Sequence, residues 1–329
     1  MKTTPENNSE LQIPKHRLIT RSNFDGIVNT ALFLKLGIVD EILFVHPKDV
    51  QEGKVEVTPD DIVSNLPYVQ NAHMAFDHLI DTPDVMKINK NHALFTDARS
   101  VSEIIYEYYG GEEVFGEELL PLVEAANRSK TANFTEKEVL SPEGWNRLIF
   151  LTDPRTGLGR FKNFRISNKA LMHALPKMLL DQTIDEILEN PDVKERVEVC
   201  ERYHEAFVEQ LERVTFIEDG VAVVDLRHEE TIYPGNRYML YARFPQVHTS
   251  IHLLPGVENR NTVLALGASI FNRSQALNMR DLVEAHGGGG HENAATCQVA
   301  HEEADKVLEK IVSNIKEQLK TEELLCETS

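Results

Sequence analysis

Residues 17–26, RLITRSNFDG, join a short apolar run to a polar turn, and residues 27–36 continue with helical periodicity until Gly37. Apolar runs of strand length follow at residues 41–45, 61–66 and 74–76. Because strand-like runs alternate with helical segments, the pattern predicts an α/β fold with a parallel sheet. Ligands of such sheets bind beyond the carboxyl ends of the strands, so the polar clusters there form the candidate site.

Acids and one imidazole mark the ends of four segments: Asp25, Asp61, Asp77-His78 and Asp153, the last after an apolar run that predicts a further strand at residues 150–153. Each alone is weak evidence, since an Asp before a Gly is also a common turn residue. In a parallel sheet we expect all four to meet at one edge. Three carboxylates and an imidazole suit a manganese or magnesium ion.

The remainder of the chain divides by composition. Residues 166–214 are highly charged and helical in pattern, typical of exposed helix faces. Strands are then expected at residues 221–226, 237–243 and 262–266. We therefore predict a catalytic domain over 1–165, a helical linker over 166–214 and a smaller α/β domain over 215–329.

Four glycines at 287–290, followed by His291, come directly after a helical segment at residues 279–286. Glycine allows positive φ and close approach to the backbone. Exposed N–H groups ending in a histidine predict a phosphate cradle. The alternative is a glycine-rich turn that holds no ligand.

Composition limits the function classes. The 329 residues are 41% hydrophobic and carry a formal net charge of -19, which argues against binding long duplex nucleic acid. It does not exclude a short anionic ligand in a local basic pocket. There is no run of about 18 apolar residues, so no membrane span is expected. The polar start lacks the core of a signal peptide, and three scattered cysteines fit a reducing cytoplasm.

The motifs together resemble the DHH phosphoesterase family with its DHH-associated C-terminal domain, in the exopolyphosphatase-like and nanoRNase-like branch. The likeness covers nearly the whole chain. It implies an active site in a cleft between two α/β domains. The residues that carry it are ITRSNFDG at 19–26, Asp61, FDH at 76–78, LTD at 151–153, FNRS at 271–274 and GGGGH at 287–291 with Ala294 and Ala295.

Three departures concern the family's two-metal site. The family usually has Asp-x-Asp in the first motif, where this chain has Asn23, and often a histidine shortly before it. The third motif usually has two histidines, where His78 is followed by Leu79. One metal position therefore loses ligands, and one or two ions are expected. The resemblance implies as ligands Asp25, Asp61, His78 and Asp153, with Asp77 orienting an imidazole and His46 and Asn23 as further candidates.

The implied function is a metal-dependent phosphodiesterase that cuts short linear dinucleotides such as pGpG into mononucleotides, by attack of metal-activated water on phosphorus. The alternatives are an exopolyphosphatase that releases orthophosphate and a catalytically impaired nucleotide-binding protein, which the changes at Asn23 and Leu79 favour. A homodimer is a candidate assembly. Expected catalytic residues are Asp25, Asp77, His78 and Arg21; expected substrate contacts are Arg99, Arg273, Gly288, Gly289, Gly290 and His291.

Overall fold

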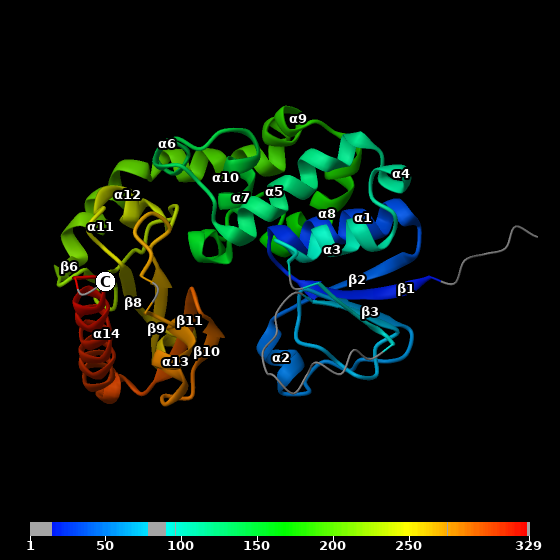
Figure 1. The fold of residues 1–329 in the computed structure, drawn as a ribbon. Coiled ribbons are helices and arrows are strands. Elements are labelled where there is room, and N and C mark those ends of the chain that lie inside the picture. Colours follow the sequence, from blue (N-terminus) through cyan, green and yellow to red (C-terminus); the bar gives the residue numbers. More distant parts are fainter. Residues whose placement is uncertain (1–14, 78–89, 96, 275, 328–329) are drawn as a thin grey trace, which may run out of the picture. The chain divides into compact units, whose positions relative to one another are not determined.

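The computed structural model describes residues 15–77, 90–95, 97–274 and 276–327. His78 lies outside these residues. The chain divides into two compact units (Figure 1): one comprises Met1–Asn133, Glu143–Pro154 and Phe161–Arg196, and the other Phe134–Pro142, Arg155–Arg160 and Val197–Ser329. The predicted domain boundaries stay a prediction. Among the described helices, none is both long enough and apolar enough to cross a bilayer.

The first unit contains a five-stranded sheet in the order β2-β1-β3-β4-β5. All four strand pairs are parallel, which confirms the predicted α/β class. The first motif begins in strand β1, which pairs with β2 on one side and β3 on the other. The strands are β1 (His16–Arg21), β2 (Val39–Val45), β3 (Asp61–Ser64), β4 (Met74–Asp77) and β5 (His92–Leu94).

Helices cover both faces of this sheet (Figure 1). Helices α1 (Phe24–Leu36) and α3 (Val101–Tyr108) lie on one face, and α2 (Pro47–Gln51) lies on the other. Helix α1 is buried along most of its length and ends at Gly37, whose φ of 72° suits a glycine C-cap. The other helices of the unit are α4 (Glu112–Phe115), α5 (Leu120–Thr131), α7 (Gly144–Thr152), α8 (Asn168–Asp181) and α9 (Ile184–Glu189); α10 (Pro191–Arg202) continues into the second unit.

The strand predicted at residues 150–153 is wrong, because this segment is the end of helix α7. Leu148, Ile149 and Thr152 are buried at helical spacing, and the Thr152 hydroxyl donates to the Leu148 carbonyl at 2.9 Å. A segment as short as residues 150–153 does not by itself distinguish a strand from a buried helix turn. Asp153 therefore follows a helix rather than a strand of the sheet.

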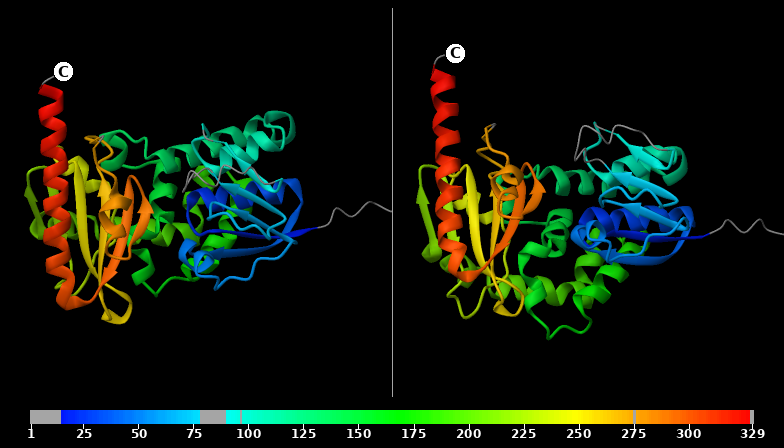
Figure 2. Two further views of the ribbon diagram at one scale, coloured as in Figure 1. Left: turned by 60° about the horizontal axis from the view of Figure 1, so that its bottom comes forward. Right: turned by 90° about the horizontal axis from the view of Figure 1, so that it is seen from below.

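The second unit contains a mixed six-stranded sheet in the order β10-β11-β9-β8-β7-β6. One face packs against α13 (Met279–Glu284) and α14 (Ala304–Glu327), which runs along the sheet (Figure 2). The strands are β6 (Thr215–Glu218), β7 (Val221–Asp225), β8 (Thr249–Pro255), β9 (Thr262–Ala268), β10 (Gly289–His291) and β11 (Ala294–Val299), with helices α6 (Glu136–Leu140), α11 (His204–Val214) and α12 (Met239–Arg243).

The strands predicted at residues 221–226 and 262–266 are confirmed, but the one predicted at 237–243 is wrong. Asn236 accepts a hydrogen bond from the amide of Tyr238 at 3.1 Å, a side-chain turn that leads into helix α12. The consecutive burial of Met239, Leu240 and Tyr241 hides the periodicity on which a sequence-based prediction depends.

Candidate active site

The carboxyl ends of parallel strands meet at one edge of the first sheet. Strand β1 ends at Arg21, and strand β4 ends at Asp77, which is 6% exposed. Asn23 and Asn65 follow the ends of β1 and β3, which are paired strands. This edge therefore carries two amides, one guanidinium and a buried carboxylate, close to the N-terminus of α1.

Close packing fixes the turn between β1 and α1. A Cβ atom at Gly26 would lie 1.9 Å from the carbonyl oxygen of Arg21, so glycine is required there. Asn23 is the N-cap of α1, and its Oδ1 accepts from the Gly26 amide at 3.0 Å. The first motif thus holds the end of β1 against the start of α1.

Asp25 is buried, 1% exposed, and its carboxylate faces the N-terminus of α3. Its Oδ1 accepts from the Ser102 hydroxyl at 2.6 Å and the Ser102 amide at 3.0 Å, and its Oδ2 from the Val101 amide at 3.4 Å. The Ser102 hydroxyl also lies 2.7 Å from Oδ1 of Asn29. Asp25 therefore satisfies amides that a helix N-terminus leaves free.

Sequence reasoning did not identify Ser102 as the partner of Asp25. A signal was present, since Ser100 and Ser102 stand at the start of α3, where hydroxyls commonly cap. However, the two segments are about 75 residues apart in the sequence, and their pairing depends on the packing of α1 against α3.

Asp61 lies at the opposite edge, so its predicted place beside Asp25 is wrong. It is the first residue of β3, about 10 Å from the carboxyl end of β3 at the usual rise. It pairs with Arg17, near the start of β1. Arg17 donates to its two oxygens at 2.7 and 2.8 Å, and the Thr58 amide donates at 2.7 Å. These hydrogen bonds outweigh burial and lower the pKa of Asp61.

Asn65 occupies the corresponding position at the carboxyl edge. It is 6% exposed, follows β3 directly and has a φ of 55°, unusual for a residue other than glycine but tolerated by asparagine. Its Nδ2 donates to Oδ1 of Asn23 at 2.9 Å. The sequence signal was its place after the apolar residues Ile62 and Val63, whereas Asp61 precedes them.

His46 follows β2 and is the N-cap of α2. Its Nδ1 accepts from the Lys48 amide at 3.2 Å, so a neutral ring carries its proton on Nε2. A histidine that binds a metal through Nε2 instead carries the proton on Nδ1. Partial burial and then the charge of Arg21 lower the pKa of His46. The ring as placed is not oriented to bind a metal through Nε2.

The described residues do not by themselves complete the metal site that the resemblance implies. Within residues 15–77, 90–95, 97–274 and 276–327, no group of three or more His, Cys, Asp or Glu side chains is arranged to hold a metal ion. Asp25 and Asp77 are buried carboxylates of the first unit, and Asp153 follows α7. His78 lies outside the described part of the chain.

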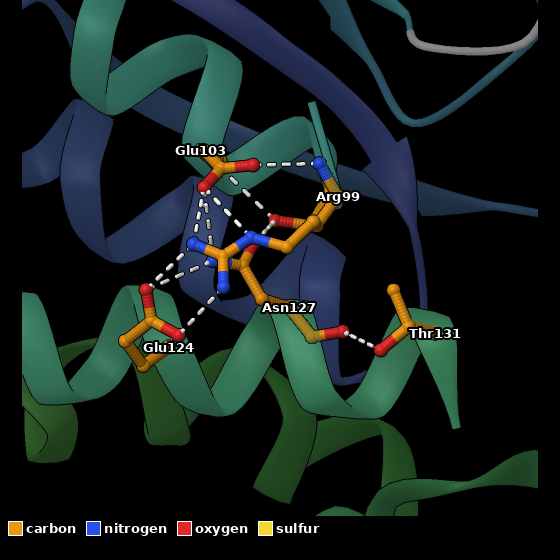
Figure 3. Close-up of polar contacts among 6 residues, drawn as sticks. Arg99, Glu103, Glu124, Asn127 and Thr131 are labelled. Carbon is orange, nitrogen blue, oxygen red and sulfur yellow. Dashed lines mark hydrogen bonds and ion pairs between the residues drawn. The ribbon is translucent and has the colours of Figure 1, made fainter. Parts of the chain in front are cut away.

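Arg99 joins α3 to α5 (Figure 3). Its guanidinium donates to Glu103 at 3.0 and 2.5 Å and to Glu124 at 3.0 and 2.7 Å. The Asn127 amide donates to the same two carboxylates. Hydrogen bonds from Arg99 to Glu103 and Glu124 raise its pKa. Arg99 is thus part of an intramolecular ion-pair cluster, and its role as a substrate contact stays a prediction.

The glycine segment has several structural roles in the second unit. The amides of Gly287 and Gly288 donate to the carbonyls of Glu284 and Val283 and close α13, so they are not exposed as predicted. Gly288 also lies too close to neighbouring atoms for a Cβ, whereas a Cβ at Gly289 would meet nothing within 4 Å. Gly289 is exposed and lies on β10, the edge strand of this sheet.

The other two predicted phosphate contacts of this unit lie in different segments. His291 ends β10, opposite Ala294, and is half-buried. Arg273 is exposed in the segment between β9 and α13. Both stay predictions as substrate contacts.

Comparison with known proteins identifies the class. No protein-family model matches the chain, and no curated protein does. Among solved structures, the chain is similar to the pGpG-specific phosphodiesterase PggH from Vibrio cholerae, with 45% identity, a TM-score of 0.77 and coverage of 92% of this chain and 100% of that one. An identity this high over the whole of PggH establishes common family membership.

More distant structures share the fold. An exopolyphosphatase-related protein from Bacteroides fragilis is 16% identical with a TM-score of 0.55, and the match covers 94% of both chains. RecJ in complex with Mn²⁺ from Thermus thermophilus is 13% identical with a TM-score of 0.53, covering 92% of this chain and 52% of RecJ. The fold and site thus define an α/β phosphoesterase. The chain belongs to the DHH phosphoesterase family.

Proposed function

We propose that the chain is a phosphodiesterase that hydrolyses short linear dinucleotides, with pGpG as the principal substrate, to mononucleotides. The observation that carries this proposal is the 45% identity to a pGpG-specific phosphodiesterase, over 92% of this chain and the full length of that enzyme. The polar residues at the carboxyl edge of the parallel sheet support it, since this is where such folds bind nucleotides.

Residues of the first unit are proposed to perform the reaction. Arg21, at the end of β1, would stabilise negative charge on the phosphate, because a guanidinium pairs well with phosphate oxygens. Asp25 and Asp77 would provide carboxylates at the same edge, with His78 next to Asp77 in the sequence. The carboxylate of Asp25 is oriented by Ser102, which limits its movement.

Divalent metal, as one or two ions of manganese or magnesium, is proposed as the cofactor, with Asp25, His78 and Asp153 as ligands. Such an ion, when bound, ionises water near neutral pH. Because the described residues alone lack a three-ligand group, the requirement needs a direct test. Mn²⁺ titration by calorimetry, compared with Asp153→Ala, should lose binding in the variant while the circular dichroism spectrum is retained.

A product assay tests the function. The protein is incubated with Mn²⁺ and either pGpG or polyphosphate, and the products are separated by chromatography. GMP from pGpG is the expected result. Orthophosphate from polyphosphate alone would instead indicate an exopolyphosphatase. If neither substrate is cleaved although the protein binds metal and pGpG, the protein would be a catalytically impaired nucleotide-binding protein. The asparagine at position 23 also favours this alternative.

Two neighbouring glycines allow a matched test of the second unit. Gly289→Ala adds a methyl group into open space, so we expect an intact fold and a raised KM for pGpG if this strand contacts the substrate. Gly288→Ala is the packing control, because its Cβ would lie 2.7 Å from Cβ of Val283. We expect His291→Ala to raise KM without changing Mn²⁺ binding; an unchanged KM would remove His291 from the substrate site.

The proposed partner is the dinucleotide alone, without long duplex nucleic acid. We also propose that the protein forms a homodimer and that it is located in the cytoplasm. Light scattering coupled to size-exclusion chromatography would test the first, and cell fractionation the second.

A further inference from the structure

Asn23 and Asn65 form a direct amide pair at the carboxyl edge of β1 and β3. Their relative orientation follows from one backbone contact. The Gly26 amide donates to Asn23 at 3.0 Å, and since a backbone N–H only donates, the atom that it meets is the acceptor Oδ1. The Asn65 atom 2.9 Å from the same Oδ1 is then the donor Nδ2.

This orientation leaves Asn23 poorly suited to bind a metal. Its Oδ1 already accepts two hydrogen bonds, from Gly26 and Asn65, and an amide oxygen has two lone pairs. Its Nδ2 carries two protons and cannot coordinate a cation. The residue that stands at the family's acidic position therefore presents hydrogen-bond donors.

The pair keeps unused hydrogen-bonding capacity. In the part of the chain that the structure describes, no further contact engages Nδ2 of Asn23 or Oδ1 of Asn65. Asn65 is more than nine-tenths buried and is held in the left-handed region at φ 55°. Oδ1 of Asn65 is not among the buried atoms that lack a partner, so this oxygen is accessible although most of the side chain is buried. An accessible acceptor at the carboxyl edge of a parallel sheet is placed to meet a ligand.

Two groups next to Asn23 carry the positive charge that an anion requires. Asn23 caps α1, a helix of 13 residues whose N-terminus carries partial positive charge. Arg21 lies two residues earlier, and its charge contributes to the lowered pKa of His46. The negative charge of Asp25 is engaged by amides and a hydroxyl at the N-terminus of α3, while Asp77 adds a carboxylate at the end of β4.

We propose that the Asn23–Asn65 pair binds the substrate in place of a second metal ion. Nδ2 of Asn23 donates to a phosphate oxygen of the dinucleotide, and Oδ1 of Asn65 accepts from a hydroxyl group or water beside it. This inference deepens the proposed phosphodiesterase function and rests on it. It also explains how a site with Asn in the first motif still recognises a phosphate.

Two variants of Asn23 retain the helix cap and therefore the fold. Asn23→Ser keeps an oxygen for the Gly26 amide but removes Nδ2, and Asn23→Asp keeps the cap and adds a negative charge. We expect Asn23→Ser to raise KM for pGpG about tenfold, which corresponds to one hydrogen bond to a charged group. Asn23→Asp should raise it further, with the number of bound Mn²⁺ ions unchanged by calorimetry.

Asn71→Asp is the matched control, because Asn71 is exposed in the turn before β4 and the substitution makes the same charge change in the same unit. Its KM should equal that of the wild type. An Asn23→Asp variant that binds one more Mn²⁺ ion and turns over faster would overturn the proposal, since the position would then be a vacant metal site. An Asn23→Ser variant with unchanged KM would also overturn it.

Binding of inorganic phosphate separates this proposal from the proposed function. If the wild type does not cleave pGpG, the phosphodiesterase proposal fails, yet the pair can still be tested by phosphate titration. Weaker phosphate binding in Asn23→Ser than in Asn71→Asp would support the pair. Equal binding in the two variants would contradict it.

Discussion

Polar residues lie at both ends of the strands of the five-stranded sheet, but their hydrogen bonding differs between the amino edge and the carboxyl edge. At the amino edge, the Asp61 carboxylate accepts four hydrogen bonds from Arg17 and Thr58 and is almost fully buried. At the carboxyl edge, Asn65 pairs with Asn23 but retains an unused acceptor among the described contacts. A polar group whose bonds are all made within the chain stabilises the fold, whereas one with spare capacity is available to a ligand.

The largest effect is expected for Asp25→Ala, which removes a carboxylate from the carboxyl edge. The amides of Val101 and Ser102 would lose a buried acceptor, so the free energy of unfolding should fall by about 3 kcal/mol. The rate of pGpG hydrolysis should fall by at least about 100-fold if Asp25 acts in the reaction. Urea titration and an activity assay measure the two effects.

Asp25→Asn is the control for that prediction, because it keeps the shape and one acceptor but removes the charge. Partial recovery of stability with no recovery of activity would assign Asp25 both roles. Full activity in either variant would show that the residue acts only in the fold.

Asp61→Asn should lower the free energy of unfolding by about 2 kcal/mol, since it weakens a partly buried pair with Arg17. We expect kcat and KM for pGpG to stay unchanged, because the residue lies at the edge opposite the proposed site. Loss of turnover with normal stability would contradict this assignment and return Asp61 to the metal site.

The same carboxylate predicts a pH dependence. Although burial raises the pKa of Asp61, hydrogen bonds from Arg17 and Thr58 outweigh it and the net pKa is lowered. The folded state therefore binds the proton less readily than the unfolded state. The stabilisation is present above about pH 4 and is lost as the pH falls through the lowered pKa. The difference in stability between wild type and Asp61→Asn should shrink below about pH 4; a constant difference would rule out this linkage.

The smallest effect is expected for Arg99→Ala. The guanidinium is about half exposed, at 49% of its side chain, and exposed ion pairs contribute little. The free energy of unfolding should fall by less than about 1 kcal/mol and KM for pGpG should not change. A KM raised tenfold without loss of stability would show that Arg99 leaves Glu103 and Glu124 to bind the substrate.

The α/β class and the parallel first sheet could be predicted from the sequence, because apolar periodicity and chain order determine them locally. The apolar start of residues 17–26 lies in β1, and the runs at 61–66 and 74–76 contain β3 and most of β4. Predictions failed where local signals are ambiguous. Residues 150–153 end a helix that begins at Gly144, outside the segment. Residues 237–243 contain the five-residue helix α12, whose consecutive buried residues show no helical periodicity.

The candidate site, like the fold, could be predicted only in part from the sequence. The sequence by itself placed Asn23, Asp25 and Asp77 next to strand ends, since those residues directly follow or end the apolar runs. Only the tertiary structure decided that Asp61 lies at the other edge, that Asp25 faces Ser102, and that Asn65 meets Asn23. The physical reason is that strand register and helix packing bring together residues about 40 to 75 positions apart, and such contacts leave no periodic signal in the sequence.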